Sequence, residues 1–175
     1  MTQYTPERLK IFTYGAPVLR KKTAPVNKMT DAIRRFTQDM VLTMYDDDGI
    51  GLSANQVGES RAIFVVGAAA FEDERGDSVF LNPEILEMSE ETDIQEEGCL
   101  SIPGIRENVP RALTIRLRWQ DLNLKTHEEA FTGFPARVMQ HEYDHLNGIF
   151  FTDRISPVRK MFIKKKLSEL ASLQI

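Results

Sequence analysis

Residues 1–175 are predicted to form one domain that mixes α-helices with antiparallel β-strands. Apolar residues recur at helical spacing between residues 30 and 45 and again after residue 133, whereas residues 112–120 alternate strictly between apolar and polar side chains. A chain of 175 residues has the length of one domain and buries roughly two thirds of its surface on folding. We find no repeat, low-complexity segment or linker that divides it.

The composition narrows the classes of partner and the cellular compartment. A net charge of −4 gives no overall basic field for binding DNA or another nucleic acid as the main ligand. The N-terminus lacks the basic and apolar segments of a signal peptide, and the longest apolar run, residues 62–71, has about half of the ~20 residues that a membrane span needs. The single cysteine, Cys99, excludes an internal disulfide and fits a reducing compartment. We therefore expect a soluble, cytoplasmic protein of bacterial type, while an organellar origin with a removed transit segment stays open.

The chain begins with an irregular arm and a helix. Residues 1–30 carry three prolines among short apolar pieces, which is typical of an arm laid over the surface of the domain. Thr30 is a candidate N-cap, and the apolar side chains that follow it predict an amphipathic helix up to Tyr45. The acidic residues 46–48 end this helix and lack the ligand pattern of a calcium loop.

Residues 49–58, with the sequence GIGLSANQVG, form either a binding wall or a plain turn. Glycines let the backbone approach a ligand closely, and Gln56 is presented from a run of small residues. The segment lacks the spacing of the phosphate-binding loops. In isolation it is more typical of a turn.

Strands are expected in the middle of the chain. Residues 61–67 and 79–81 are predicted strands with a charged, exposed loop between them. Residues 112–120 form the clearest strand, and residues 125–131 return from it as a hairpin with one buried face. His127 lies among polar residues of the returning strand, and we expect it to be exposed rather than a metal ligand.

A second helix is predicted after Gly133, with Pro135 in its first turn and Gly148 at its C-terminal end. One stripe of this helix changes from apolar to metal-binding side chains, and we expect it to face inward. The stripe consists of Phe134, Val138, His141 and His145. Residues 149–151 are expected to form a short buried strand.

The last predicted helix begins at Ser156 and Pro157, which are typical of a helix start. We expect one side to face the domain and the other to face solvent. The expected apolar side consists of Val158, Met161, Phe162 and Leu167, and the expected basic side consists of Arg159, Lys160, Lys164, Lys165 and Lys166.

The strongest chemical signal is the pattern H-E-x-x-H in residues 141–145. On a helix, His141 and His145 lie one turn apart on the same face, so both imidazoles can bind one metal ion. Glu142 is too close to His141 to be a third ligand on that face, but it can reach a water held by the metal and accept its proton. This is the layout of metal-assisted amide hydrolysis.

A catalytic metal needs a third protein ligand besides the two histidines. One peptidase class has a third histidine six residues after the second, but Phe151 occupies that position here. Glu169, on the last predicted helix, is a candidate without a supporting pattern. Cys99 is favoured over it, and a thiolate with two imidazoles suits iron(II), zinc, cobalt or nickel. The segment around Cys99, EEGCLSIP, contains too much glycine and proline for a regular strand throughout.

Three segments of the sequence resemble the signature segments of peptide deformylase. They are GIGLSANQ at residues 49–56, EGCLS at residues 97–101 and QHEYDH at residues 140–145, in the order and approximate spacing of that family. With the proline-containing arm and the last helix, the resemblance covers essentially the whole chain. It implies an α+β fold in which antiparallel strands surround the motif helix, with an N-terminal amphipathic helix and a C-terminal helix.

The resemblance also implies an activity and a metal site. The family is a group of metal-dependent hydrolases that remove the N-formyl group from new polypeptides beginning with formylmethionine, and its usual native metal is ferrous iron. Glu142 would be the general base and then the general acid. The implied metal ligands are Cys99, His141 and His145.

Further residues are implied to contact the substrate. The Gln56 side-chain amide and the Leu100 backbone N–H would stabilise the oxyanion. Phe134 and Val138 precede His141 on the same stripe, and we expect them to accept the methionine side chain. The residues implied to line the path of the peptide are Ile50, Gly51, Glu97, Gly98 and Arg106.

Two other functions stay open at this point. An endopeptidase would use the same base with Glu169 as the third ligand, and a non-catalytic domain would hold a closed metal site that serves folding alone. The basic last helix is also a candidate contact with the ribosome, from which formylated chains emerge, although a solvated face is the simpler explanation of its lysines.

Overall fold

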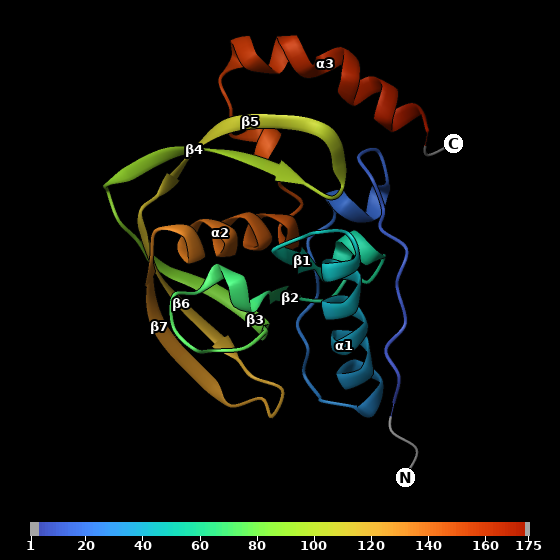
Figure 1. The fold of residues 1–175 in the computed structure, drawn as a ribbon, viewed down its shortest axis with the longest axis vertical. Helices are drawn as coiled ribbons and strands as arrows, with labels where there is room; N and C mark the ends of the chain where they lie inside the picture. The colour runs from blue at the N-terminus through green and yellow to red at the C-terminus, as the bar shows by residue number, and fades with distance from the viewer. Residues whose placement is uncertain (1–3, 174–175) are drawn as a thin grey trace.

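A central helix, α2, lies between two antiparallel sheets in the computed structural model, which describes residues 4–173 (Figure 1). The larger sheet has five strands in the order β1-β2-β3-β6-β7, and the smaller one is the hairpin β4-β5. Helix α1 packs beside the larger sheet, and α3 lies across the hairpin. The helices are α1 (Asp31–Asp46), α2 (Phe134–Leu146) and α3 (Pro157–Ser172), and the strands are β1 (Gly51–Ser53), β2 (Ile63–Val66), β3 (Ser78–Met88), β4 (Thr92–Cys99), β5 (Ile102–Ala112), β6 (Thr114–Gln120) and β7 (Thr126–Thr132).

Three groups of buried apolar side chains hold these layers together. The first fills the space between the larger sheet and α2, the second lies between the sheet and α1, and the third joins β5, the N-terminal arm and α3. Within residues 4–173, no helix has the length and apolar character needed to cross a membrane. Representative core members are Phe64, Leu117 and Met139 in the first group, Met40, Leu52 and Val65 in the second, and Ile105, Phe150 and Ile163 in the third.

The predicted first helix is confirmed as α1, and its expected N-cap is present. Thr30 Oγ1 accepts a hydrogen bond from the Ile33 N–H at 3.2 Å. The arm before the helix is irregular, as predicted, apart from a 3-10 turn at Pro17–Arg20, and residues 1–3 lie outside the described part of the chain. Asp39 and Thr43 of α1 anchor the arm by accepting hydrogen bonds from its backbone N–H groups.

Helix α2 also begins and ends where its sequence predicts. Pro135 lies in its first turn, and Gly148 follows its last turn with φ +73°. A Cβ at Gly148 would lie 2.5 Å from the Arg20 carbonyl oxygen, so glycine is required there for space as well as for backbone conformation. The Thr23 N–H donates to the Leu146 carbonyl at 2.9 Å. The N-terminal arm is therefore held against the C-terminal end of α2.

The predicted hairpin in the second half of the chain is confirmed as β6 and β7. The two strands pair in register, and Ile115 and Leu117 are fully buried on the inner face, as their alternation predicts. His127 is half-exposed, and its Nε2 contacts Asp121 Oδ2 at 2.7 Å. Strand β3 continues to Met88, beyond the predicted end at residue 81. Its pairing with β6 shifts register between Leu81 and Glu84 and again between Ile85 and Glu87, and resumes after each shift.

Two segments without a regular strand pattern contribute to strands. The segment around Cys99 is not a regular strand throughout, as expected, because Leu100 and Ser101 form the turn between β4 and β5 and the pairing shifts register between Glu97 and Cys99. Pro103 and Pro110 are tolerated because β5 is an edge strand of a two-stranded sheet, where one side of the backbone needs no ladder hydrogen bonds. Residues 51–53 form β1 rather than part of a plain turn, since they pair with β2 and are fully buried.

The expected strand at residues 149–151 is replaced by a turn. Phe150 and Phe151 are buried, as predicted, but the chain continues as the 3-10 helix Phe151–Asp153. The Phe150 N–H donates to Asp153 Oδ2 at 2.8 Å, and this local hydrogen bond turns the chain toward α3.

Helix α3 begins at Ser156 as predicted, but a different face is buried. Ser156 Oγ accepts a hydrogen bond from the Arg159 N–H. Ile163 is buried, and Leu167 and Leu170 pack beside it at spacings of four and three residues. The helix carries apolar residues on two faces and covers only one of them. The exposed apolar residues are Val158, Met161 and Phe162.

Candidate metal centre

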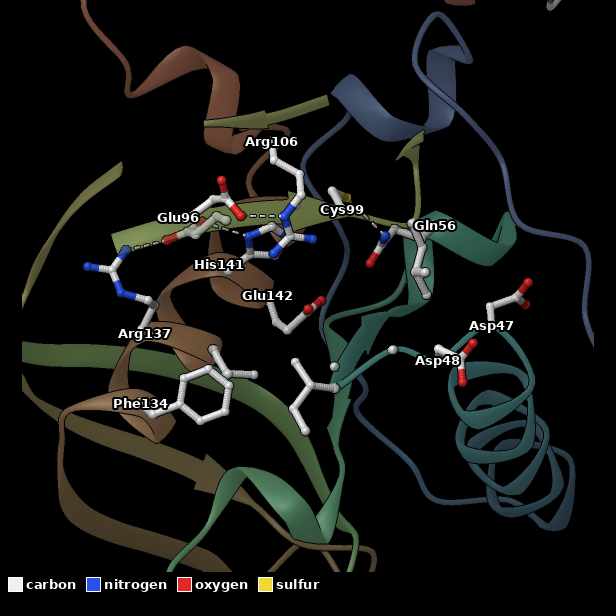
Figure 2. Close-up of a pocket in the computed structure, with 17 residues that line it drawn as sticks. Asp47, Asp48, Gln56, Glu96, Cys99, Arg106, Phe134, Arg137, His141 and Glu142 are labelled. Atoms are coloured by element: carbon white, nitrogen blue, oxygen red, sulfur yellow. Dashed lines mark hydrogen bonds and ion pairs between the residues drawn. The ribbon is translucent and has the colours of Figure 1, made fainter. Parts of the chain in front are cut away.

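Three potential metal ligands converge where the end of β4 meets α2. Figure 2 shows two of them, Cys99 and His141. Cys99 ends β4, and His141 and His145 lie one turn apart on α2. The Cys99 Sγ lies 3.2 Å from His145 Nε2, which lies 3.1 Å from His141 Nε2. These three donor atoms all lie within 4.8 Å of one another. The fold thus brings together the ligand set that the sequence favoured.

The chemistry of this cluster fits a divalent metal ion. A thiolate and two imidazole nitrogens direct lone pairs at a common point, and such a soft donor set suits a transition metal. Glu142 Oε2 is buried without a hydrogen-bond partner among residues 4–173, so a carboxylate oxygen is free in the same region. The His145 backbone is fixed separately, because Asn55 Nδ2 donates to its carbonyl oxygen at 2.5 Å.

Glu97 fixes the orientation of the His141 ring. Its Oε2 lies 2.9 Å from His141 Nδ1, and this contact leaves Nε2 to face the cluster. Arg111 donates to both Glu97 oxygens at 2.8 and 2.9 Å. Burial raises the pKa of the Glu97 carboxyl, but the hydrogen bonds and charges of Arg111 and His141 outweigh burial and hold that pKa well below its usual value. Glu97 lines the pocket, as expected, but with its carboxylate engaged by these donors.

Alternating charges continue from Glu97 into the interior. Arg111 also donates to Asp144 of α2, and Arg137 of α2 donates to Glu97 Oε1 at 2.7 Å. Arg111, Asp144 and Arg137 are all buried. The sequence analysis missed these three residues because their partners lie far away in the chain. A usable signal existed for Arg137, which precedes His141 by four residues and therefore shares its helix face.

Gln56 is oriented by its own 3-10 segment, Ala54–Val57. Its Oε1 accepts hydrogen bonds from the Ser53 N–H at 3.0 Å and the Ser53 hydroxyl at 2.8 Å. Its Nε2 donates to Ser101 Oγ at 3.1 Å and lies 3.5 Å from Cys99 Sγ. Residues 49–58 therefore form a wall of the site, and the preference for a plain turn in this segment was wrong.

A pocket of about 440 Å³ opens beside the cluster, between the β1 side and the β4-β5 side of the molecule (Figure 2). Cys99, His141 and Glu142 line it together with Gln56 and Leu100. Every residue that the sequence analysis expected along the peptide path or the methionine pocket also lines it. These residues are Ile50, Gly51, Glu97, Gly98, Arg106, Phe134 and Val138.

The helical stripe on α2 is buried only in part. Phe134 is 48% exposed, whereas Val138 is buried. Phe134 lies at the first residue of α2, where the helix has not yet entered the space between the sheets. The expectation that the whole stripe faces inward is therefore corrected for its first member.

Glu142 occupies a tight, buried position at the wall of the pocket. Burial is the main cause that raises the pKa of its carboxyl to about 7, because the charged form loses its hydration. A Cβ at Gly51 would lie 2.7 Å from Glu142 Oε1. Glycine at position 51 therefore makes the space in which the carboxylate sits.

Glu169, the competing third ligand, lies elsewhere. Its side chain is 65% exposed on α3, where its nearest charged partner is Lys165. It does not line the pocket, and within residues 4–173 the group of candidate ligands contains Cys99 instead.

The family model and the curated relatives that match this chain all describe the same family. The family model described as polypeptide deformylase matches residues 8–161. The peptide deformylase of Thermotoga neapolitana is 43% identical over 162 residues, which cover 93% of this chain and 96% of the relative.

Solved structures resemble the chain over most of its length. The crystal structure of peptide deformylase from Thermotoga maritima has a TM-score of 0.81 and 42% identity, and it covers 86% of this chain and 99% of that one. A class I type b peptide deformylase from Acinetobacter baumannii, bound to Met-Ala-Ser, has a TM-score of 0.82 and 36% identity and covers 86% of this chain and 100% of that one.

The raised pKa of Glu142 predicts how stability depends on pH in the metal-free protein. Below about pH 4.5 the carboxyl is protonated in both the folded and the unfolded state, so the parent and Glu142→Gln should have similar free energies of unfolding. Between pH 4.5 and about 7 the unfolded state ionises first, and the parent loses stability relative to the variant. Above pH 7 the variant should be more stable by on the order of 3 kcal/mol.

Denaturant unfolding of the two metal-free proteins, followed by circular dichroism between pH 4 and 8, measures this difference. Because all other titrating groups are shared, the difference between the two curves isolates Glu142. A difference that does not change with pH would contradict the prediction.

Proposed function

Because the chain belongs to the polypeptide deformylase family and therefore removes the N-formyl group from nascent peptides, we propose that Cys99, His141 and His145 hold the metal on which this family depends. The convergence of their three donor atoms within 4.8 Å carries this proposal. We propose ferrous iron as the native metal. Zinc, nickel and cobalt also suit one thiolate and two imidazoles.

Glu142 is the proton carrier in this proposal. When bound, the metal supplies Lewis acidity that polarises the formyl group and lowers the pKa of water. The Glu142 carboxylate accepts a proton from the attacking water and delivers it to the amide nitrogen as the C–N bond breaks. One water and one formamide become formate and a free N-terminal amine. The buried Oε2 without a partner among residues 4–173, in the pocket that His141 also lines, supports this role.

Gln56 and Leu100 stabilise the negative charge that develops on the formyl oxygen. The Gln56 Oε1 is engaged by Ser53, which directs the Nε2 donor toward Cys99. Leu100 follows Cys99 directly in the chain and lines the same pocket, and its backbone N–H is the second donor. Removing one such donor typically costs ~10²- to 10³-fold in rate.

The peptide runs between the two sides of the pocket. A structural neighbour from Acinetobacter baumannii is bound to Met-Ala-Ser, which supports a peptide with an N-terminal methionine as the ligand of this site. Ile50 and Gly51 line one side, and Gly98 and Arg106 line the other. Glu97 completes the second side while it holds His141.

Phe134 and Val138 accept the methionine side chain. Both line the pocket on the helix that carries His141. Val138 lies about one turn before His141, and Phe134 lies about two turns before it. The half-exposed Phe134 covers the outer part, and the buried Val138 forms the apolar wall closer to the metal ligands.

We further propose that residues 1–175 act as one catalytic domain in the cytoplasm and that α3 contacts the ribosome. Nascent formylated chains emerge there, and α3 presents lysines beside exposed apolar residues. The exposed lysines are Lys160, Lys164, Lys165 and Lys166.

The central test is formate release from a formyl-Met peptide by iron-loaded protein kept under anaerobic conditions. The parent should release formate, and Glu142→Gln should lose roughly 10²- to 10⁴-fold in kcat while it retains its metal. Glu169→Gln is the matched control and should keep both activity and metal. A metal-loaded parent without activity would overturn the proposal, and loss of metal from Glu169→Gln would favour the endopeptidase ligand set.

A second test addresses the methionine pocket. Val138→Asp should lower the preference for formyl-Met over formyl-Ser peptides by ~10-fold or more, because a methionine side chain placed there would remove the hydration of the new carboxylate. Val138→Ala, which adds no charge, should keep most of the preference. The ratio of the two kcat/KM values is measured within one protein sample, so partial unfolding cancels. An unchanged ratio in Val138→Asp would assign the methionine side chain to another wall.

A third test addresses the ribosome contact. Reversing Lys164, Lys165 and Lys166 to glutamate should abolish co-sedimentation with ribosomes at low salt, since the contact depends on positive charge. Reversing the exposed Lys21, Lys22 and Lys28 of the N-terminal arm changes the net charge equally and should have little effect. Equal effects of the two triple variants would reduce the contact to nonspecific charge attraction.

A further inference from the structure

Arg137 of α2 lines the pocket and donates four hydrogen bonds through its side chain. Its side chain is only 5% exposed. Its Nη1 donates to Glu97 Oε1 at 2.7 Å and to the Val109 carbonyl at 2.8 Å. Its Nη2 donates to the Asp93 carbonyl at 3.0 Å and to Asp93 Oδ1 at 2.7 Å.

From these contacts we infer that Arg137 is a positioning residue for the metal centre, which acts by holding Glu97 in the orientation that directs His141. This inference rests on the proposed metal site.

The first supporting observation is the way Glu97 bridges two turns of α2. Arg137 precedes His141 by four residues, so the two side chains lie one turn apart on the same face. Glu97 Oε1 accepts from Arg137, and Glu97 Oε2 lies against His141 Nδ1. With both oxygens attached to one helix face, the carboxylate cannot rotate without breaking a hydrogen bond. The His141 ring is thereby fixed with Nε2 toward Cys99 and His145.

The second observation concerns the hairpin that carries Cys99. Val109 belongs to β5 and Asp93 to β4, so one guanidinium bonds both strands and the helix at the same time. Arg137 therefore sets the distance between the strand that ends in Cys99 and the helix that carries the two histidines. The planar guanidinium suits this task, because it holds several donors in a fixed geometry.

The third observation distinguishes the role of Arg137 from that of Arg111. Arg111 donates to both Glu97 oxygens and supplies a full positive charge, so Glu97 stays paired when Arg137 is removed. What is lost is the attachment of the carboxylate to α2 one turn before His141, together with the bonds to Val109 and Asp93. The expected consequence is a misdirected His141 in a folded protein.

The test compares the cobalt-loaded parent with Arg137→Met, Arg137→Lys and the control Arg159→Met. Arg159 also donates twice, at 2.9 and 2.8 Å, to a buried carboxylate of the same hairpin, Glu107. Arg159→Met therefore removes an arginine that pairs with a buried carboxylate of the same hairpin without touching Glu97, although the Arg159 side chain itself is half-exposed. The readouts are the rate of cobalt transfer to a chelator, the visible absorption of the bound cobalt, and kcat and KM for a formyl-Met peptide.

Arg137→Met should lose cobalt roughly 10- to 100-fold faster than the parent, with shifted cobalt absorption bands and a lower kcat. Arg137→Lys should fall between the two, because one ammonium can reach Glu97 but cannot bond both strands as well. Arg159→Met should match the parent in cobalt transfer and spectrum.

Two results would overturn the inference. The first is cobalt transfer and absorption in Arg137→Met equal to those of Arg159→Met; if Arg137→Met does not fold, the same comparison with Arg137→Lys decides. The second is a parent that does not bind one cobalt per chain, which would overturn the metal site itself and this inference with it.

Discussion

Burial of the Glu97 carboxylate is the constraint that determines how the elements around the site pack. An ionised carboxylate removed from water costs several kcal/mol unless donors replace its hydration. Here Arg111 of β5 and two residues of α2 supply those donors, while Glu97 itself belongs to β4. The strands and the helix satisfy this charge only in the arrangement that also brings Cys99 to the histidines. The ligand geometry thus follows from a satisfied buried charge.

The apolar core and the buried charges contribute to the fold in different ways. Buried ion networks add little net stability, because the cost of dehydration offsets the attraction between the charges. The three apolar groups around the larger sheet and α3 therefore stabilise the fold, through burial of side chains such as Phe64 and Met40. The charges around Glu97 instead define one arrangement among the packings that an apolar core alone would permit.

The sequence predicted the elements whose signals are local. Caps and periodicity identified α1 and α2, and H-E-x-x-H together with a lone cysteine predicted the three side chains that the fold brings together as candidate ligands. The hairpin β4-β5 was not predicted because its glycine and proline residues obscure the strand pattern. The predicted buried face of α3 was wrong because apolar residues occupy two sides of that helix. Arg111 and Arg137 escaped notice because their partners lie 14 to 44 residues away, and ion pairs at such separations leave no periodic trace.

The attachment of the N-terminal arm to the end of α2 has a consequence for the synthesis of this protein. Arg20 bonds the Gly148 carbonyl and Asp153, at separations of 128 and 133 residues. These contacts cannot form until residue 153 has been translated and has left the ribosome. The arm must wait without its partner while the residues between them are made. A catalyst that processes newly made chains therefore cannot attach its own N-terminal arm to α2 at the time the arm itself emerges.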